Sequence, residues 1–147
     1  PVEYEPPVNG QAAALYANGV KLVLREGGWL PLGSCPVRFE GETGWVETAD
    51  NGDMVASTPA LLTGRGAKIG GYPANNHIRD FLNCVKTRGQ PKANADVACH
   101  THIACHAAGI SIFLKRKLAY DPVKNVFVGD EEANRLRSEA LREPWRL

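Results

Sequence analysis

The first half of the chain alternates short apolar runs with turn-forming dipeptides, a pattern typical of antiparallel hairpins. Runs 13–17 and 20–26 flank Asn18-Gly19, the dipeptide that a two-residue type I′ turn requires because both central residues need positive φ. In the second run, every other residue from Val20 is apolar, while the residues between are mixed. We therefore predict a hairpin with one apolar face and one mixed face.

The next stretch predicts a second hairpin and a further strand. Runs 37–40 and 45–49 flank a glycine-bounded turn, and the dipeptide Asn51-Gly52 leads to a short apolar run at 54–56. The first half of the chain is therefore expected to form an antiparallel meander.

Glycine and proline mark three connecting segments. Residues 1–10 are expected to form an extended lead-in rather than a packed element. Residues 27–36 are expected to form a loop that carries Trp29. Residues 57–76 make an unusually long Gly-rich connection, which is typical of a functional or mobile loop, and its glycines match neither common phosphate-binding fingerprint.

The second half changes to a helical period. One amphipathic stripe has the spacing i, i+3, i+4, i+7 and is formed by Ile78, Phe81, Leu82 and Val85. A second helix is predicted from about Asp96 to Leu118, and its many small residues allow close approach to a sheet. A short edge strand at 126–128 is expected before a third helix, which Asp130 caps and which runs to about Leu141.

Composition and charge narrow the function classes. The 147 residues suit one domain of ordinary size. The formal net charge of +1 gives no electrostatic case for nucleic acid or an anionic membrane as partner. No uninterrupted apolar run approaches the ~20 residues of a membrane span. The sequence thus predicts a soluble single domain, 1–147, of the α+β class.

Two further features concern processing and redox state. The chain has no initiator Met, its one methionine being Met54, and its first residues lack the pattern of a signal peptide, so we interpret it as a processed product or an excised piece of a longer polypeptide. A chain of this size with a good core needs no covalent staples, so the cysteines are expected to be free thiols: Cys35, Cys84, Cys99 and Cys105.

Cysteine and histidine cluster in the second predicted helix. Helical spacing places Cys99, His102 and His106 along one face, and zinc takes such ligands. A structural zinc site typically needs ligands from a second element, so the favoured interpretation is that Cys99 and Cys105 pack as small apolar residues, while the histidines cap polar neighbours or face solvent. A Cys/His metal-binding module and a Cys99 nucleophile remain less favoured alternatives.

Several segments follow one another along the chain in a distinctive order. They are YANGVKLVL, VRFEGETGWVET, HIRDFLNCVKTRGQP, CHAAGISIFLKRKLAYDP, FVGDEEANRL and LREPWRL. Each segment alone is modestly specific, but their order resembles the C-terminal part of bacterial oxidoreductases of the glucose-fructose oxidoreductase and inositol dehydrogenase family (Gfo/Idh/MocA). The similarity covers nearly the whole chain from about Tyr16 onward.

The resemblance implies a two-domain enzyme in which an N-terminal Rossmann domain binds NAD or NADP. The C-terminal domain then has an open, mostly antiparallel sheet with helices on one face, and the other face is available for a homo-oligomer. The dinucleotide fingerprint and the family's Glu-Lys-Pro motif are missing here, and its His and Asp motif would lie upstream of Pro1. The Rossmann domain is therefore expected to be absent, and no catalytic or cofactor-binding residue is assigned; by position, His100, His102 and His106 are not the family's catalytic histidine.

The sequence thus predicts the C-terminal substrate and oligomerisation domain of an NAD(P)-dependent oxidoreductase for a small sugar-like or polyol substrate, inactive alone. The substrate-side candidates are the loop 64–76 and the residues Trp29, Tyr72, His77 and Arg79; the competing interpretation is that they are solvated loop and helix-start residues. The alternative functions are a non-enzymatic assembly module of the same fold and the Cys/His metal-binding module. No metal ligand is assigned, and a cytoplasmic location is slightly favoured.

Overall fold

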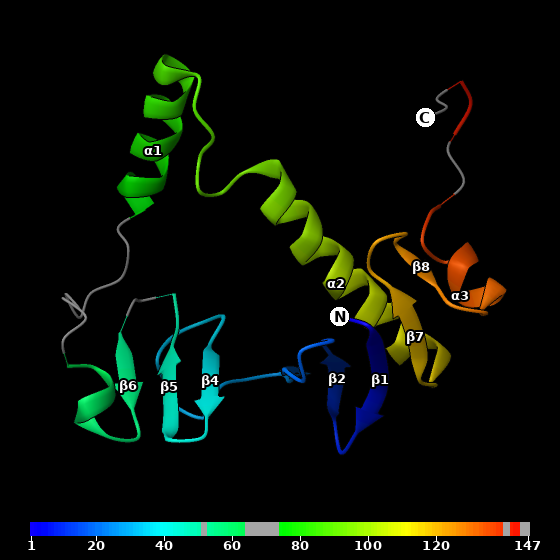
Figure 1. The fold of residues 1–147 in the computed structure, drawn as a ribbon, viewed down its shortest axis with the longest axis horizontal. Coiled ribbons are helices and arrows are strands. Elements are labelled where there is room, and N and C mark those ends of the chain that lie inside the picture. The colour runs from blue at the N-terminus through cyan, green and yellow to red at the C-terminus, as the bar shows by residue number, and fades with distance from the viewer. Residues whose placement is uncertain (51–52, 64–73, 140–141, 145–147) are drawn as a thin grey trace. The chain divides into compact units, whose positions relative to one another are not determined.

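The computed structural model describes residues 1–50, 53–63, 74–139 and 142–144, with the side chains of α1 from His77 onward. The sheets and helices confirm the predicted α+β class (Figure 1). The chain divides into two compact units, Pro1–Arg25 with Ala95–Leu147 and Glu26–Asn94. The predicted single domain stays a prediction. The elements are β1 (Glu3–Val8), β2 (Gln11–Leu15), β3 (Lys21–Leu24), β4 (Val37–Gly41), β5 (Gly44–Thr48), β6 (Met54–Ala56), η1 (Pro59–Leu61), α1 (Ala74–Thr87), α2 (Ala95–Leu114), β7 (Leu118–Asp121), β8 (Val126–Phe127) and α3 (Glu131–Arg135).

The first unit is built on a five-stranded sheet with the order β3-β2-β1-β7-β8, in which all neighbours are antiparallel. The strand β1 is at its centre, so the expectation of an unpacked lead-in was wrong. Tyr4 in this strand is fully buried. The prolines Pro6 and Pro7 fall where the β1–β2 register shifts, which is where a strand tolerates residues without a backbone N–H.

The two Asn-Gly dipeptides of this unit form different turns. Asn9 and Gly10 both have positive φ, 52° and 78°, and join β1 to β2 in the two-residue loop that a type I′ turn serves. At the second dipeptide Gly19 has positive φ, 85°, whereas Asn18 does not. The predicted hairpin of β2 and β3 is confirmed. The prediction of a type I′ turn there was wrong, because the loop between the two strands is longer than two residues.

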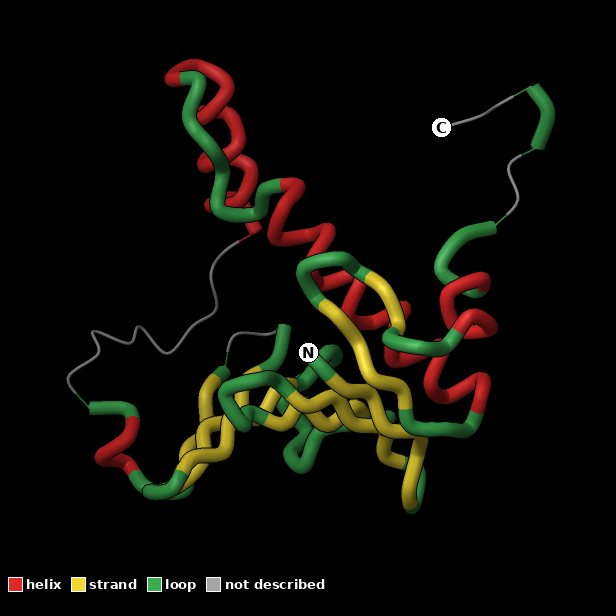
Figure 2. Tube along the Cα trace, turned by 45° about the vertical axis from the view of Figure 1, so that its right-hand side comes forward, coloured by secondary structure: helices red, strands yellow, loops and turns green. Residues whose placement is uncertain are grey.

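Helix α2 lies against β1 and β2 (Figure 2). Ala107, Ala108 and Ser111 are buried at this contact, as the predicted close approach requires. The helix ends at Leu114, earlier than predicted, since Lys115 has a φ of 54°. The apolar residue Leu118 continues the helical spacing but is a buried strand residue. The core comprises Tyr4, Ala14, Ala107, Ala108, Leu118, Tyr120, Phe127 and Ala133.

By length and composition alone, α2 could also cross a membrane. Histidine and threonine interrupt the apolar residues of this helix, so it contains no long uninterrupted apolar run. A helix that covers a sheet meets the same criterion, and α2 packs on β1 and β2. The length and composition of α2 are therefore only weak evidence that it crosses a membrane.

Three aromatic rings fill the centre of this unit. The Tyr4 ring lies edge-on to Tyr120 at 5.5 Å between centroids, and Tyr120 meets Phe127 at 5.2 Å. Within the described part of the chain, the buried hydroxyl of Tyr4 has no hydrogen-bond partner. Burial raises the pKa of Tyr4, so this hydroxyl stays neutral.

The tail closes the sheet edge. The short strand β8 confirms the predicted edge strand, and Asp130 caps α3 by accepting the N–H of Ala133 at 2.9 Å. Arg116 donates to both Asp130 oxygens; these bonds and the Ala133 N–H lower the pKa of the carboxyl. The helix ends at Arg135 rather than near Leu141, because the segment after it forms a tight turn.

The second unit contains a three-stranded antiparallel sheet, β4-β5-β6, and helix α1. The second predicted hairpin and its following strand are confirmed, while the Asn51-Gly52 turn lies outside the described residues. The predicted helical stripe is also present, but its members are half exposed: Ile78, Phe81, Leu82 and Val85.

Candidate functional site

The substrate-side candidates that the structure describes all lie in the second unit. Trp29 is in the loop before β4 and is 47% exposed. His77 and Arg79 are exposed on the N-terminal part of α1. Tyr72 and loop residues 64–73 lie outside the described residues. The assignment of these residues to a substrate site stays a prediction.

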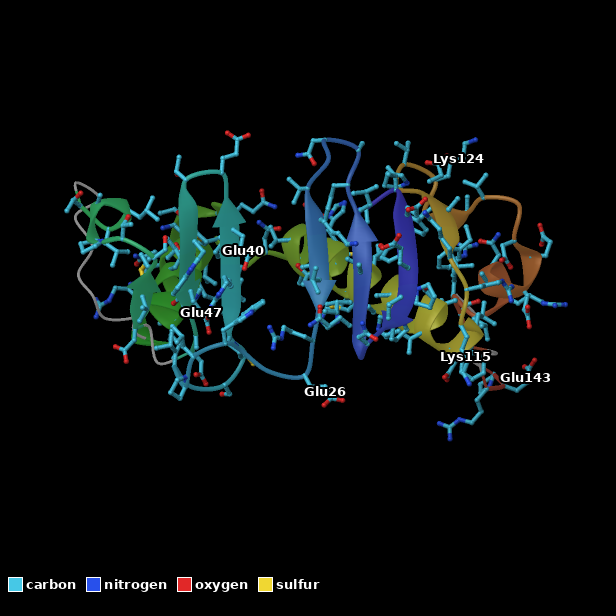
Figure 3. All side chains as sticks on the ribbon, turned by 90° about the horizontal axis from the view of Figure 1, so that it is seen from below. Glu26, Glu40, Glu47, Lys115, Lys124 and Glu143 are labelled. Carbon is cyan, nitrogen blue, oxygen red and sulfur yellow. The ribbon has the colours of Figure 1, made fainter. Side chains whose placement is uncertain are left out.

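A buried ion pair lies behind Trp29. Arg38 on β4 and Glu47 on β5 are directly opposite in the hairpin, and Glu47, labelled in Figure 3, is fully buried. The guanidinium Nε donates to Glu47 Oε2 at 2.8 Å, and Nη2 forms an ion pair with the same oxygen at 2.6 Å. The other carboxylate oxygen, Oε1, accepts the backbone N–H groups of Trp29 at 3.1 Å and Leu30 at 2.9 Å. Both oxygens are therefore satisfied inside the unit.

The electrostatics of Glu47 follow from these donors. Burial by itself would raise the pKa of this carboxyl, because it disfavours the charged form. The N–H of Leu30, the guanidinium of Arg38 and the N–H of Trp29 outweigh burial and lower the pKa of Glu47. Glu47 is therefore a carboxylate at neutral pH, and it anchors the loop to the sheet.

Arg38 also holds the aromatic side chains. Its guanidinium lies over the Trp29 ring at 4.3 Å and over the Trp45 ring at 4.0 Å. The loop backbone fits closely here, since a Cβ on Gly28 would come within 2.7 Å of Pro36 and 2.9 Å of Glu47. The Trp29 side chain is thus fixed by its backbone and its ring, with about half of its surface left to solvent.

Arg38 and Glu47 were not among the site residues predicted from the sequence. A signal existed, since the predicted two-stranded register places these opposite charges directly across from each other. What periodicity does not report is that the flanking loop folds over this face and removes the pair from water.

The cysteines of α2 differ from their favoured interpretation, whereas His102 and His106 are exposed, as expected. Cys99 and Cys105 are exposed free thiols rather than packed apolar residues, because the helix uses its alanine face to meet the sheet. Cys35 and Cys84 are free as well. The rings of His102 and His106 stack at 6.3 Å. Among the described residues no three His, Cys, Asp or Glu side chains form a group that could hold a metal ion, so the metal-binding alternative gains no support.

Beside these histidines is a pocket of about 360 Å³ within the first unit. It lies between α2, β7, β8 and the segment that follows α3. Its apolar lining comes from Ile103, Ala107, Ile110, Phe127 and Leu136. The remaining lining residues carry polar or ionisable groups: Cys99, His102, His106, Tyr120, Asn125 and Arg137.

The sheet face opposite α2 carries a network of ion pairs. Lys117 Nζ lies 2.7 Å from Glu3 and 3.7 Å from Glu5, and Lys21 Nζ lies 3.1 Å from Glu5. The register places Val23 on this same face, 38% exposed. The face is therefore mixed, as the alternation in the sequence predicted.

Comparison with known proteins gives one match. A family model described as the C-terminal alpha/beta domain of an oxidoreductase family, Gfo/Idh/MocA, matches residues 14–147. No curated protein and no solved structure matches the chain. The match starts within β2 and includes β3 to β8 and the helices α1, α2 and α3, whereas the central strand β1 precedes it. The chain therefore belongs to the C-terminal α/β domain family of the Gfo/Idh/MocA oxidoreductases.

Proposed function

We propose that this chain is the substrate and oligomerisation domain of an NAD(P)-dependent oxidoreductase that acts on a sugar-like or polyol substrate. The match to the family's C-terminal domain carries the proposal. An N-terminal Rossmann domain supplies the nicotinamide and the catalytic groups. The chain contributes the loops on the substrate side, with Trp29, Tyr72, His77 and Arg79 as candidates.

The geometry around Trp29 supports its role. An aromatic ring that contacts a sugar needs a fixed orientation, because ordering a mobile side chain on binding costs free energy. The Glu47 carboxylate holds the Trp29 backbone, and the Arg38 guanidinium holds the indole ring. The Trp29 ring is thus ordered before any ligand arrives.

The cofactor assignment predicts a difference between the chain alone and the two-domain enzyme. Titration of NADH into the chain, followed by nicotinamide fluorescence, is expected to show no saturable binding, whereas the same chain joined to its Rossmann domain binds NADH or NADPH. The physical reason is that this sequence contains neither common phosphate-binding fingerprint, GxGxxG or GxxxxGK(S/T), to receive the pyrophosphate. Tight NADH binding or dehydrogenase activity of the chain alone would contradict the proposal.

The face of the five-stranded sheet opposite α2 is the proposed surface for a homo-oligomer. It combines the ion pairs of Lys117 and Lys21 with half-exposed apolar side chains such as Val23 and Leu15. Apolar residues among charges that can pair across an interface are typical of subunit contacts. A non-enzymatic assembly module would use the same face. Binding of NADH or NADPH by the chain joined to its Rossmann domain distinguishes the oxidoreductase domain from such a module.

Val23→Asp tests the oligomer. A carboxylate at position 23 that is buried in a subunit contact loses its water without gaining a partner, so the molar mass measured by light scattering is expected to fall to that of the monomer. Val123→Asp is the matched control, because Val123 is 89% exposed in the turn between β7 and β8. A wild-type chain that is already monomeric, or an equal response of both variants, would remove the interface proposal; melting curves verify that each variant is folded.

A further inference from the structure

We propose that the pocket beside His102 and His106 binds a small organic carboxylate with an apolar ring. The pocket belongs wholly to the first unit, whereas the substrate-side candidates belong to the second. This binding activity therefore goes beyond the oxidoreductase function and does not depend on it.

The size and lining of the pocket set the first part of the ligand. Its volume of about 360 Å³ is in the range of small-molecule sites, roughly 300–1,000 Å³. Ile103 and Ile110 supply aliphatic surface from α2, while Ala107 and Phe127, which also line the pocket, are almost fully buried. Such a floor favours an apolar ring over a polar or extended ligand.

The nitrogen-bearing side chains set the second part. Arg137, His102 and His106 reach the pocket from two different elements, while none of its lining residues is Asp or Glu. Guanidinium groups bind carboxylates with charge-assisted hydrogen bonds, and imidazole N–H groups add further donors. The excess of donors over acidic groups therefore favours an anion.

Contacts around Asn125 hold the cationic group in place. Arg137 Nη1 donates to the backbone carbonyl of Asn125, and Tyr120 Oη donates to Asn125 Oδ1 at 3.3 Å. A guanidinium that is oriented by a backbone carbonyl loses less conformational freedom when a ligand binds.

Benzoate is the probe, with benzamide as its neutral isostere. In histidine-ring NMR spectra of the full chain, benzoate is expected to shift the signals of His102 and His106 saturably. His77 and His100 do not line the pocket and are expected to stay unchanged. Benzamide, which lacks the charge, is expected to bind at least roughly tenfold more weakly.

Arg137→Leu is the variant that tests the charge, and Arg135→Leu is its matched control. Arg135 is an exposed arginine of α3 that does not line the pocket. The first variant is expected to lower benzoate affinity roughly tenfold or more, and the second to leave it unchanged. Ile110→Trp, which fills the floor and retains every charge, is expected to abolish binding.

Several results would overturn the proposal. They include no saturable shift with benzoate, equal affinities for benzoate and benzamide, and equal losses of benzoate affinity in the two arginine variants. A shift spread over all four histidines would mean general charge screening and would overturn it as well. Because Ile110→Trp and Arg137→Leu act through different parts of the pocket, a folding defect in one leaves the other decisive. These readouts involve no nicotinamide, so a failed cofactor titration leaves them unaffected.

Discussion

Phe127→Ala is expected to lower the free energy of unfolding of the first unit by about 3–5 kcal/mol, the usual cost of removing a buried aromatic ring. Phe127 is 1% exposed, and its ring contacts both Tyr4 and Tyr120 edge-on. The loss removes apolar burial and leaves a cavity between the sheet and α3 that the neighbouring rings fill only in part. Amide hydrogen exchange of β1 and β7 measures the effect within this unit.

Phe113→Ala is the control for that substitution. It removes the same ring from α2, where Phe113 is 72% exposed, so its effect on stability is expected to stay within about 0.5 kcal/mol. If the two variants unfold with equal free energies, the aromatic cluster is not the core of the unit.

Arg38→Met is expected to destabilise the second unit by about 3–5 kcal/mol, the cost typical of breaking a buried ion pair. Methionine retains the apolar stem but leaves the Glu47 carboxylate without its guanidinium hydrogen bond and ion pair. It also removes the cation between the rings of Trp29 and Trp45. Hydrogen exchange of β5 amides measures the change, and Arg79→Met, an exposed arginine on α1, is the matched control.

The pH dependence separates the charge from packing. The lowered pKa of Glu47 means that its stabilising contribution is present above the unfolded pKa of about 4.3 and is lost as pH falls through the lower folded pKa. The difference between wild type and Arg38→Met is therefore expected to shrink in acid. A difference that stays constant with pH would assign the effect to packing.

A second substitution makes the interpretation sharper. Glu47→Gln retains an oxygen for the N–H groups of Trp29 and Leu30 while removing the buried charge. The double variant with Arg38→Met is therefore expected to be more stable than Arg38→Met alone. An additive loss in the double variant would contradict a role for the unpaired charge.

Local patterns identified much of this fold. Asp130 was recognised as a helix cap, and its carboxylate does accept the Ala133 N–H, because capping depends on residues within one turn. The strands of both predicted hairpins followed from alternation, and α1 and α2 from helical spacing, for the same local reason. The order of the segments also indicated the family that the match to residues 14–147 confirms.

Other features required partners distant in sequence. The strand β1 looks like a loop by composition, yet β7 pairs with it from more than one hundred residues away and buries Tyr4. Leu118 fits a helical stripe, but the turn at Lys115 places it in β7. Neither outcome follows from propensity, because each depends on which surface a distant segment covers.

The sequence by itself determined the α+β class, the two long helices, the cap of α3 and the family. Only the tertiary structure decided that Glu47 is buried, that Cys99 and Cys105 are exposed, and that Arg137 lines the same pocket as His102. The physical reason is range: periodicity and capping act over a few residues, whereas burial and convergence depend on long-range packing.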